Sequence, residues 1–120
     1  MSVYEKAYDS FKEAGLKTYV PNTHKGDVTE QYIVLLDGGR TRAGNFSSQT
    51  VLLDVLCYVP GNRFTDLDIL ADEVKDVAKK KLFPLLLPTG NETQAYYDDS
   101  INGWMKSVEY RYTVRNRSLR

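Results

Sequence analysis

The feature that most constrains the fold is a long apolar stretch in the middle of the chain, Gln49–Pro60 (QTVLLDVLCYVP). All odd-numbered positions from 51 to 59 are apolar, and Thr50 and Asp54 are the polar even-numbered positions up to 58. A two-residue period with branched and aromatic side chains is typical of a β-strand. Because both faces are largely apolar, we expect this strand at the centre of a sheet, covered on both sides for much of its length.

A second apolar strand is predicted over Gln31–Leu36, next to the first. The connection Asp37–Ser48 begins with Asp-Gly-Gly, which is a turn signal, and carries Arg40 and Arg42 among small polar residues. Phe46 is its only large apolar residue. The connection is either a long loop or a hairpin whose arms extend beyond the core. Since it cannot bury itself, we expect it to be mobile alone or held by a partner.

Helical spacing of apolar residues predicts two amphipathic helices. The first covers Ser2–Ala14, with Ser2 and Glu5 as a capping box. The second begins after Thr65, with Asp68 at the matching capping position. Acidic residues gather at its start and lysines at its end, which is the arrangement that the helix dipole favours.

The last third of the chain predicts two strands joined by Asn102-Gly103, a strong hairpin signal. The second of these, Trp104–Arg115, alternates between a core face and a face that carries Glu109, Arg111 and Arg115. This polar face is expected to contact either solvent or a partner.

The segment FPLLLP, before these strands, contains two prolines that exclude a helix. Its leucines, among them Leu85 and Leu86, require cover. We therefore expect the segment to pack under the sheet edge or against another subunit.

These elements predict one α+β domain spanning residues 1–120. The expected architecture is an antiparallel sheet of about four to five strands with two helices packed on one face, plus an extended hairpin or loop. Sixteen basic and sixteen acidic residues give zero formal net charge. That balance disfavours nonspecific binding to nucleic acid or to an anionic membrane as the main task.

Candidate reactive residues are few. Cys57 is the only cysteine, so no internal disulfide forms, and its apolar strand predicts a small buried side chain. His24 is the only histidine and stands in a polar segment, which predicts a solvated loop residue. No catalytic motif or metal-ligand spacing occurs in the sequence, so we expect neither enzymatic activity nor a cofactor. An export signal and a membrane span are also missing, which predicts a protein kept inside the cell or released by lysis.

Four segments in order carry a family resemblance: the amphipathic N-terminal helix, QYIVLLDGG, QTVLLDVLCYVP followed by TDLDILADEVKDVAKK, and the closing YYDDSINGWMKSVEYRYTV. In size and order the chain resembles the tail terminator, or tail completion, proteins of long-tailed bacteriophages and prophages, also described as minor capsid proteins. The resemblance covers the whole chain and rests on its layout rather than on a sharp motif.

The resemblance implies a structural virion protein without enzymatic activity. Such a protein forms a hexameric ring on the end of the tail tube, stops tube growth and offers the surface that joins the head. The implied partners are further copies of the chain, the tail tube protein and the head–tail connector proteins, with DNA only as the passing genome and no membrane. It is assembled in the host cytoplasm and ends in the tail or neck of the virion.

Three groups of residues are the candidate interface under this resemblance. They are the connection with Arg40, Arg42 and Phe46; the leucines Leu85 and Leu86; and the last-strand charges Glu109, Arg111 and Arg115. Each group also has an ordinary explanation, as a loop, an edge cover and a solvated face.

Other functions remain open. A head-closure or adaptor protein of the same junction would share the ring-forming, non-enzymatic character. A small nucleic-acid or protein binding module is an alternative of a different class, against which the zero net charge and the lack of interleaved basic and aromatic residues argue.

Overall fold

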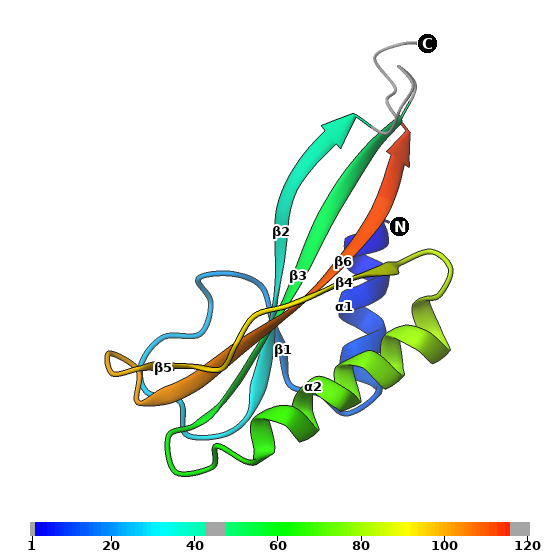
Figure 1. Ribbon diagram of the computed structural model, residues 1–120. Coiled ribbons are helices and arrows are strands. Elements are labelled where there is room, and N and C mark those ends of the chain that lie inside the picture. Colours follow the sequence, from blue (N-terminus) through cyan, green and yellow to red (C-terminus); the bar gives the residue numbers. More distant parts are fainter. Residues whose placement is uncertain (1, 43–47, 116–120) are drawn as a thin grey trace.

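The computed structural model describes residues 2–42 and 48–115, with side chains for 2–38 and 48–114, and has an α+β fold, as expected (Figure 1). The helical elements are α1 (Val3–Glu13), α2 (Asp66–Val77) and a π-helical turn, η1 (Ala78–Leu82). The strands are β1 (Thr18–Tyr19), β2 (Tyr32–Arg42), β3 (Ser48–Pro60), β4 (Leu87–Glu92), β5 (Tyr96–Asp98) and β6 (Gly103–Arg115).

The sheet has the order β1-β2-β3-β6-β4, and β5 also pairs with β6. β3 pairs with β2 on one side and with β6 along its whole length on the other, which confirms its central position. The sheet has six strands rather than four or five, and β1 lies parallel to β2, with Thr18 opposite Ile33. The chain leaves α1 and runs beside β2 in the same direction, so a purely antiparallel sheet is not formed.

The connection between the two central strands is a hairpin over its described part. β2 extends to Arg42, and its register against β3 shifts between Asp37 and Gly39. β1 pairs with β2 only at Ile33 and Val34, and the pairing of β4 with β6 begins at Arg111. Beyond these points β2, β3 and β6 form a three-stranded ribbon that extends past both helices (Figure 1).

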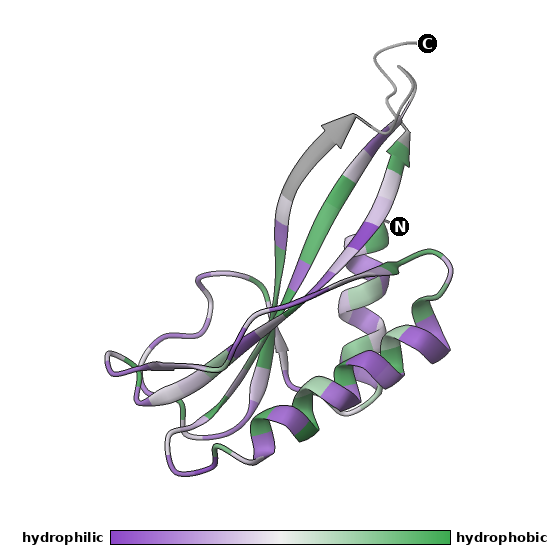
Figure 2. Cartoon of the chain, viewed as in Figure 1, coloured by the Kyte–Doolittle hydropathy of each residue, from purple (hydrophilic) through white to green (hydrophobic). Residues whose placement is uncertain are grey.

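One face of the sheet packs against both helices and forms the core. The odd-numbered residues of β3 from Val51 to Val59 have no exposed surface. α1 contributes Ala7 and Phe11, and α2 contributes a stripe that includes Leu70 and Val74. Figure 2 shows the hydrophobic run in β3 and the alternating hydrophobic and hydrophilic bands of α2. Burial of this side contributes roughly 1.5–3 kcal/mol for each large side chain.

Cys57 lies inside this core, as expected. Its side chain is fully buried, and burial raises the pKa of the thiol to about 12. The thiolate is the reactive form of cysteine, so this group is chemically inert at neutral pH.

The two predicted helix caps have different outcomes. Ser2 caps α1 as expected, because its hydroxyl accepts a hydrogen bond from the backbone of Glu5 at 3.1 Å. The predicted cap at Thr65 is wrong, since its side chain makes no capping hydrogen bond. A turn before the helix provides the hydrogen bonds for its first backbone N–H groups instead. The N–H of Asp66 donates to the carbonyl of Arg63, and the N–H of Leu67 donates to the carbonyl of Phe64.

The predicted core face of β6 is confirmed. Val108, Tyr110 and Tyr112 are buried, and the turn before the strand contains Asn102 with a positive φ of 51°. Lys106 shares this face, and its ammonium group reaches Glu92 at 3.2 Å and Asp68 at 3.3 Å. A lysine is tolerated at this position because two carboxylates surround its charge.

The central position of β3 predicts the outcome of a core substitution. Leu53→Ala removes a fully buried side chain and should reduce the free energy of unfolding by about 2–5 kcal/mol. The matched change Ile69→Ala, on the exposed side of α2, should change it by about 0.5 kcal/mol or less. Denaturant titration of both variants measures the difference, and equal losses would contradict this account of the core.

Candidate functional site

The face of the sheet opposite the helices is the main candidate surface, and we call it the open face. It displays even-numbered residues of β2 and β3 and odd-numbered residues of β6. The sequence predicted a second layer of cover over this face of β3. Over the described chain no second layer of helices or strands lies there, and these β3 side chains are only half-buried. Cover on both sides of β3 is therefore a wrong prediction. The open face comprises Tyr32, Val34, Leu36, Leu52, Asp54, Leu56, Tyr58, Met105, Ser107, Glu109 and Arg111.

An aromatic cluster occupies one end of the open face. The ring centroids of His24 and Tyr32 are 4.3 Å apart, and those of Tyr32 and Tyr58 are 4.9 Å apart in a stacked arrangement. Tyr19 adds an edge-on contact to Tyr32 at 5.4 Å. His24 is half-buried in this cluster, so the prediction of a solvated loop residue is wrong. The loop after β1 folds back onto the sheet because the imidazole ring of His24 packs against the rings of Tyr19 and Tyr32.

A groove of about 360 Å³ lies between this loop and the open face. Its walls include Val20 from the loop, Leu36 and Leu56 from the sheet, and Asp98 from the end of β5. Burial raises the pKa of Tyr32 to about 12, so that hydroxyl stays neutral at physiological pH. Val20, Leu36 and Leu56 give the groove an apolar wall suited to an apolar or aromatic group of a partner, while Lys25 and Asp98 add one charge of each sign to its lining.

Two acids face each other across the middle of the open face. Asp54 of β3 is directly opposite Glu109 of β6. Burial and the nearby Glu109 raise the pKa of Asp54 above its ordinary value. Hydrogen bonds from the Thr89 hydroxyl at 2.7 Å and the Asn91 amide at 3.0 Å lower the pKa of Glu109.

Neither carboxylate forms an ion pair with a side chain that the structure describes. Glu109 has neutral donors, while Asp54 is held among apolar neighbours close to a like charge. This centre of the open face is therefore a site where an added cation would be favourable.

The predicted interface residues of the last strand and of the FPLLLP segment are partly brought together. Arg111 and Leu85 line one cleft of about 460 Å³, with Thr50 and Thr113 beside them. Leu86, in contrast, is 1% exposed and belongs to the core, so it offers nothing to a partner of the folded chain. Its neighbour Leu85 is 43% exposed, because the chain turns here and the N–H of Leu86 donates to the carbonyl of Leu82 at 3.0 Å.

The arginines of the connection are placed by backbone register. Arg40 lies opposite Val51 and Arg42 opposite Gln49, after the register shift that follows Asp37. Arg115 pairs with Ser48 at the same end of the ribbon. The side chains of these three arginines, and all of Phe46, lie outside the described part of the chain.

A second exposed apolar feature is the segment between η1 and β4, which we call the ridge and define as Phe83, Pro84 and Leu85. Phe83 is 60% exposed and Leu85 is 43% exposed. The ridge separates the Leu85 cleft from another cleft of about 350 Å³, whose walls include Phe83, Tyr110 and Lys79. Large apolar side chains held out between two clefts are typical of contact sites.

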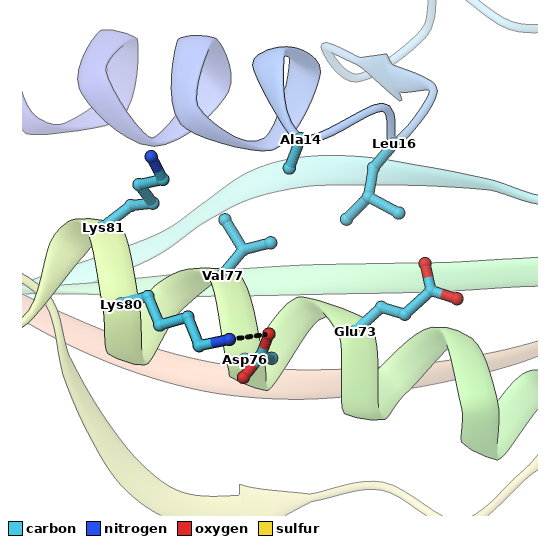
Figure 3. A pocket seen from close by; sticks show the side chains of 7 residues that line it. All are labelled: Ala14, Leu16, Glu73, Asp76, Val77, Lys80 and Lys81. Carbon is cyan, nitrogen blue, oxygen red and sulfur yellow. Dashed lines mark ion pairs between the residues drawn. The ribbon is translucent and has the colours of Figure 1, made fainter.

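The cleft between the helices is a weaker candidate. Figure 3 shows Ala14 and Leu16 facing Val77 of α2, with charged side chains around them. The ammonium group of Lys80 lies 3.1 Å from a carboxylate oxygen of Asp76. Two acidic and two basic side chains surround this cleft, which has a volume of about 300 Å³. The packing of the two helices is enough to explain the cleft.

Neither a metal-binding cluster nor a membrane-spanning helix is found among the described residues. No three side chains of His, Cys, Asp or Glu within 2–42 and 48–115 gather closely enough to hold a metal ion. In the same part of the chain, neither helix has the length and apolar character needed to cross a bilayer.

Sequence reasoning missed the apolar half of the open face. Its apolar residues include Val34, Leu36 and Leu56. The alternation of Gln49–Pro60, which contains Leu56, predicts cover on both sides, and the two apolar faces of Gln31–Leu36 predict a place inside the sheet, so neither pattern predicts an exposed apolar surface. The available signal was the small number of helices, since two amphipathic helices cover only one face of a sheet this wide.

Comparison with known proteins adds no family. No protein-family model matches the chain, and no curated protein matches it either.

The raised pKa of Asp54 predicts a small gain from neutralising it. A folded-state pKa above the unfolded one means that ionised Asp54 destabilises the fold, so stability falls as pH rises through the folded pKa. Asp54→Asn should therefore raise the free energy of unfolding at pH 7 by up to about 0.5 kcal/mol. The gain should vanish well below the ordinary pKa of an aspartate, where Asp54 is protonated in both the folded and the unfolded state. Thermal melts at pH 7 and in acid measure it, and a loss of stability at pH 7 would contradict the assignment.

Proposed function

We propose that the protein is a ring-forming tail terminator of a long-tailed phage. In this role it caps the tail tube and provides the surface that joins the head. The proposal combines the whole-chain resemblance with one structural observation, the half-apolar open face.

The open face supports a role in assembly. It places Val34, Leu36 and Leu56 on one continuous surface of the sheet, where their side chains are partly exposed to solvent. Exposed apolar surface of this kind is stabilised when another protein covers it. A subunit that assembles into a ring has such a surface in its free state and buries it in the virion.

The ribbon supports a second contact, along the axis of the tube. The outer edge of β2 beyond Val34 has no neighbouring strand among the described residues. Free strand edges pair with strands of other chains through backbone hydrogen bonds. A ring of such ribbons would pair with the exposed strands of the last tube ring. Further tube subunits could then no longer add there, because the ring presents a different surface.

The direct test measures association with tail tubes. Purified protein, alone and with tube protein, should form a ring of defined mass that is seen at one end of the tube by electron microscopy. A chain that stays monomeric in both conditions would contradict the proposal.

A genetic test separates the terminator from the other junction proteins. Deletion of the gene should leave tails of abnormal length with unattached heads. Tails of normal length with leaking heads would instead indicate a head-closure or adaptor protein.

The two arginines of the hairpin provide a finer test. Arg40→Ala with Arg42→Ala should reduce attachment to the tube by about tenfold or more and leave the melting temperature unchanged, because both residues lie on the ribbon, past the part of β2 that pairs with β1. Leu53→Ala serves as the contrasting variant, since it lowers the melting temperature. A matching loss of stability in the arginine variant would mean that the hairpin is structural.

A further inference from the structure

We propose that the ring is closed by a head-to-tail contact in which the ridge of one copy, with Lys79 beside it, docks on the open face of the next copy. This inference rests on the proposed ring and names the two surfaces that form it. The occupant of the open face is thus a second copy of this chain.

The apolar groups of the two surfaces match. The ridge offers Phe83 and Leu85, while the open face offers Leu36 and Leu56 beside a groove of about 360 Å³. An aromatic side chain in such a groove is a frequent anchor of protein interfaces. Docking would remove from water two of the large exposed apolar side chains on one copy and cover the half-buried leucines on the other.

The charges match as well. Lys79 is exposed, lines the same cleft as Phe83, and has no ion pair within the described side chains. The centre of the open face has two carboxylates, Asp54 and Glu109, and no cation paired with either of them. Docking the ridge places the ammonium group near these acids, where partial burial strengthens their attraction.

The ridge and the apolar part of the open face, Leu36 and Leu56, are different parts of the molecule, so the contact is heterologous. The ridge precedes the edge strand β4, whereas the hydrophobic part of the open face lies on β2 and β3 at the other side of the sheet. Each copy can then use its ridge on one neighbour and its open face on the other. Repetition of such a contact gives a ring when the rotation closes.

The test uses one variant for each surface. Leu36→Glu adds a third acid to the open face, and Phe83→Glu with Leu85→Glu changes the ridge. Each protein should fold normally, because the altered side chains are exposed, and should self-associate about 100-fold more weakly than the wild type. Sedimentation velocity over a concentration series measures association, with tail tubes added in a parallel series.

Mixing the two variants is the decisive step. The intact ridge of the Leu36→Glu protein can still dock on the intact open face of the ridge variant. The mixture should therefore form a heterodimer that grows no further, although each protein alone is monomeric. A face-to-face dimer would instead leave the ridge variant self-associating, which would overturn the proposal.

A matched control places two glutamates elsewhere on the surface. Ile69 and Phe64 are 55% and 49% exposed and belong to neither the ridge nor the open face. Ile69→Glu with Phe64→Glu should leave association within about twofold of the wild type. An equal loss in this control would show that added charge alone disrupts the ring and would overturn the contact.

The ion pair is tested by a double-mutant cycle. Lys79→Glu and Asp54→Asn should each weaken association by about tenfold, and the double variant should lose less than the product of the two effects. Independent, multiplying losses would overturn the pairing of these groups.

The outcomes separate this contact from the proposed function. Wild-type protein that never associates, alone or on tail tubes, overturns the ring itself and with it the contact. Rings that form normally from both surface variants overturn the contact alone. A ridge variant that still forms rings but no longer attaches to tubes assigns the ridge to the tube protein instead.

Discussion

The backbone pairing of β3 with both β2 and β6 is the interaction on which the rest of the structure depends. A strand paired on both sides must place its side chains above and below the sheet, so β3 fixes two surfaces at once. Two amphipathic helices cover one surface, and no helix or strand of the described chain covers the other. The core and the candidate interaction surface are therefore two sides of the same strand, and a one-residue shift in its register would exchange them.

The two surfaces differ in how firmly their side chains are held. On the helix side, Leu53 and its odd-numbered neighbours are fully buried and make the ordinary contacts of a protein interior. On the open side, Leu36 and Leu56 are only partly covered, and Asp54 lies opposite Glu109 without a cation. Partly exposed leucines and two acids opposite each other destabilise an isolated subunit. Assembly into the proposed ring would bury the leucines and bring a cation to the acids.

Much of the candidate site was predictable from residue types, but its exposure was not. The alternation along Gln49–Pro60 indicates an apolar second face, and the same alternation places Glu109 and Arg111 together on one face of β6. Leu85 and Leu86 were equally plausible contact residues, yet the chain buries the second and exposes the first. Whether an apolar position is covered depends on which elements lie over it, and periodicity alone contains no information on this.

The sequence by itself determined the α+β class, the central strand, the closing hairpin and the inert character of Cys57, because local periodicity and turn chemistry dictate each of these. Tertiary structure alone decided the parallel pairing of β1, the partial burial of His24 among tyrosines, and the cleft that Leu85 and Arg111 both line. These depend on contacts between residues far apart in the chain. The free energy of such contacts is set by packing in three dimensions, which no short stretch of sequence encodes.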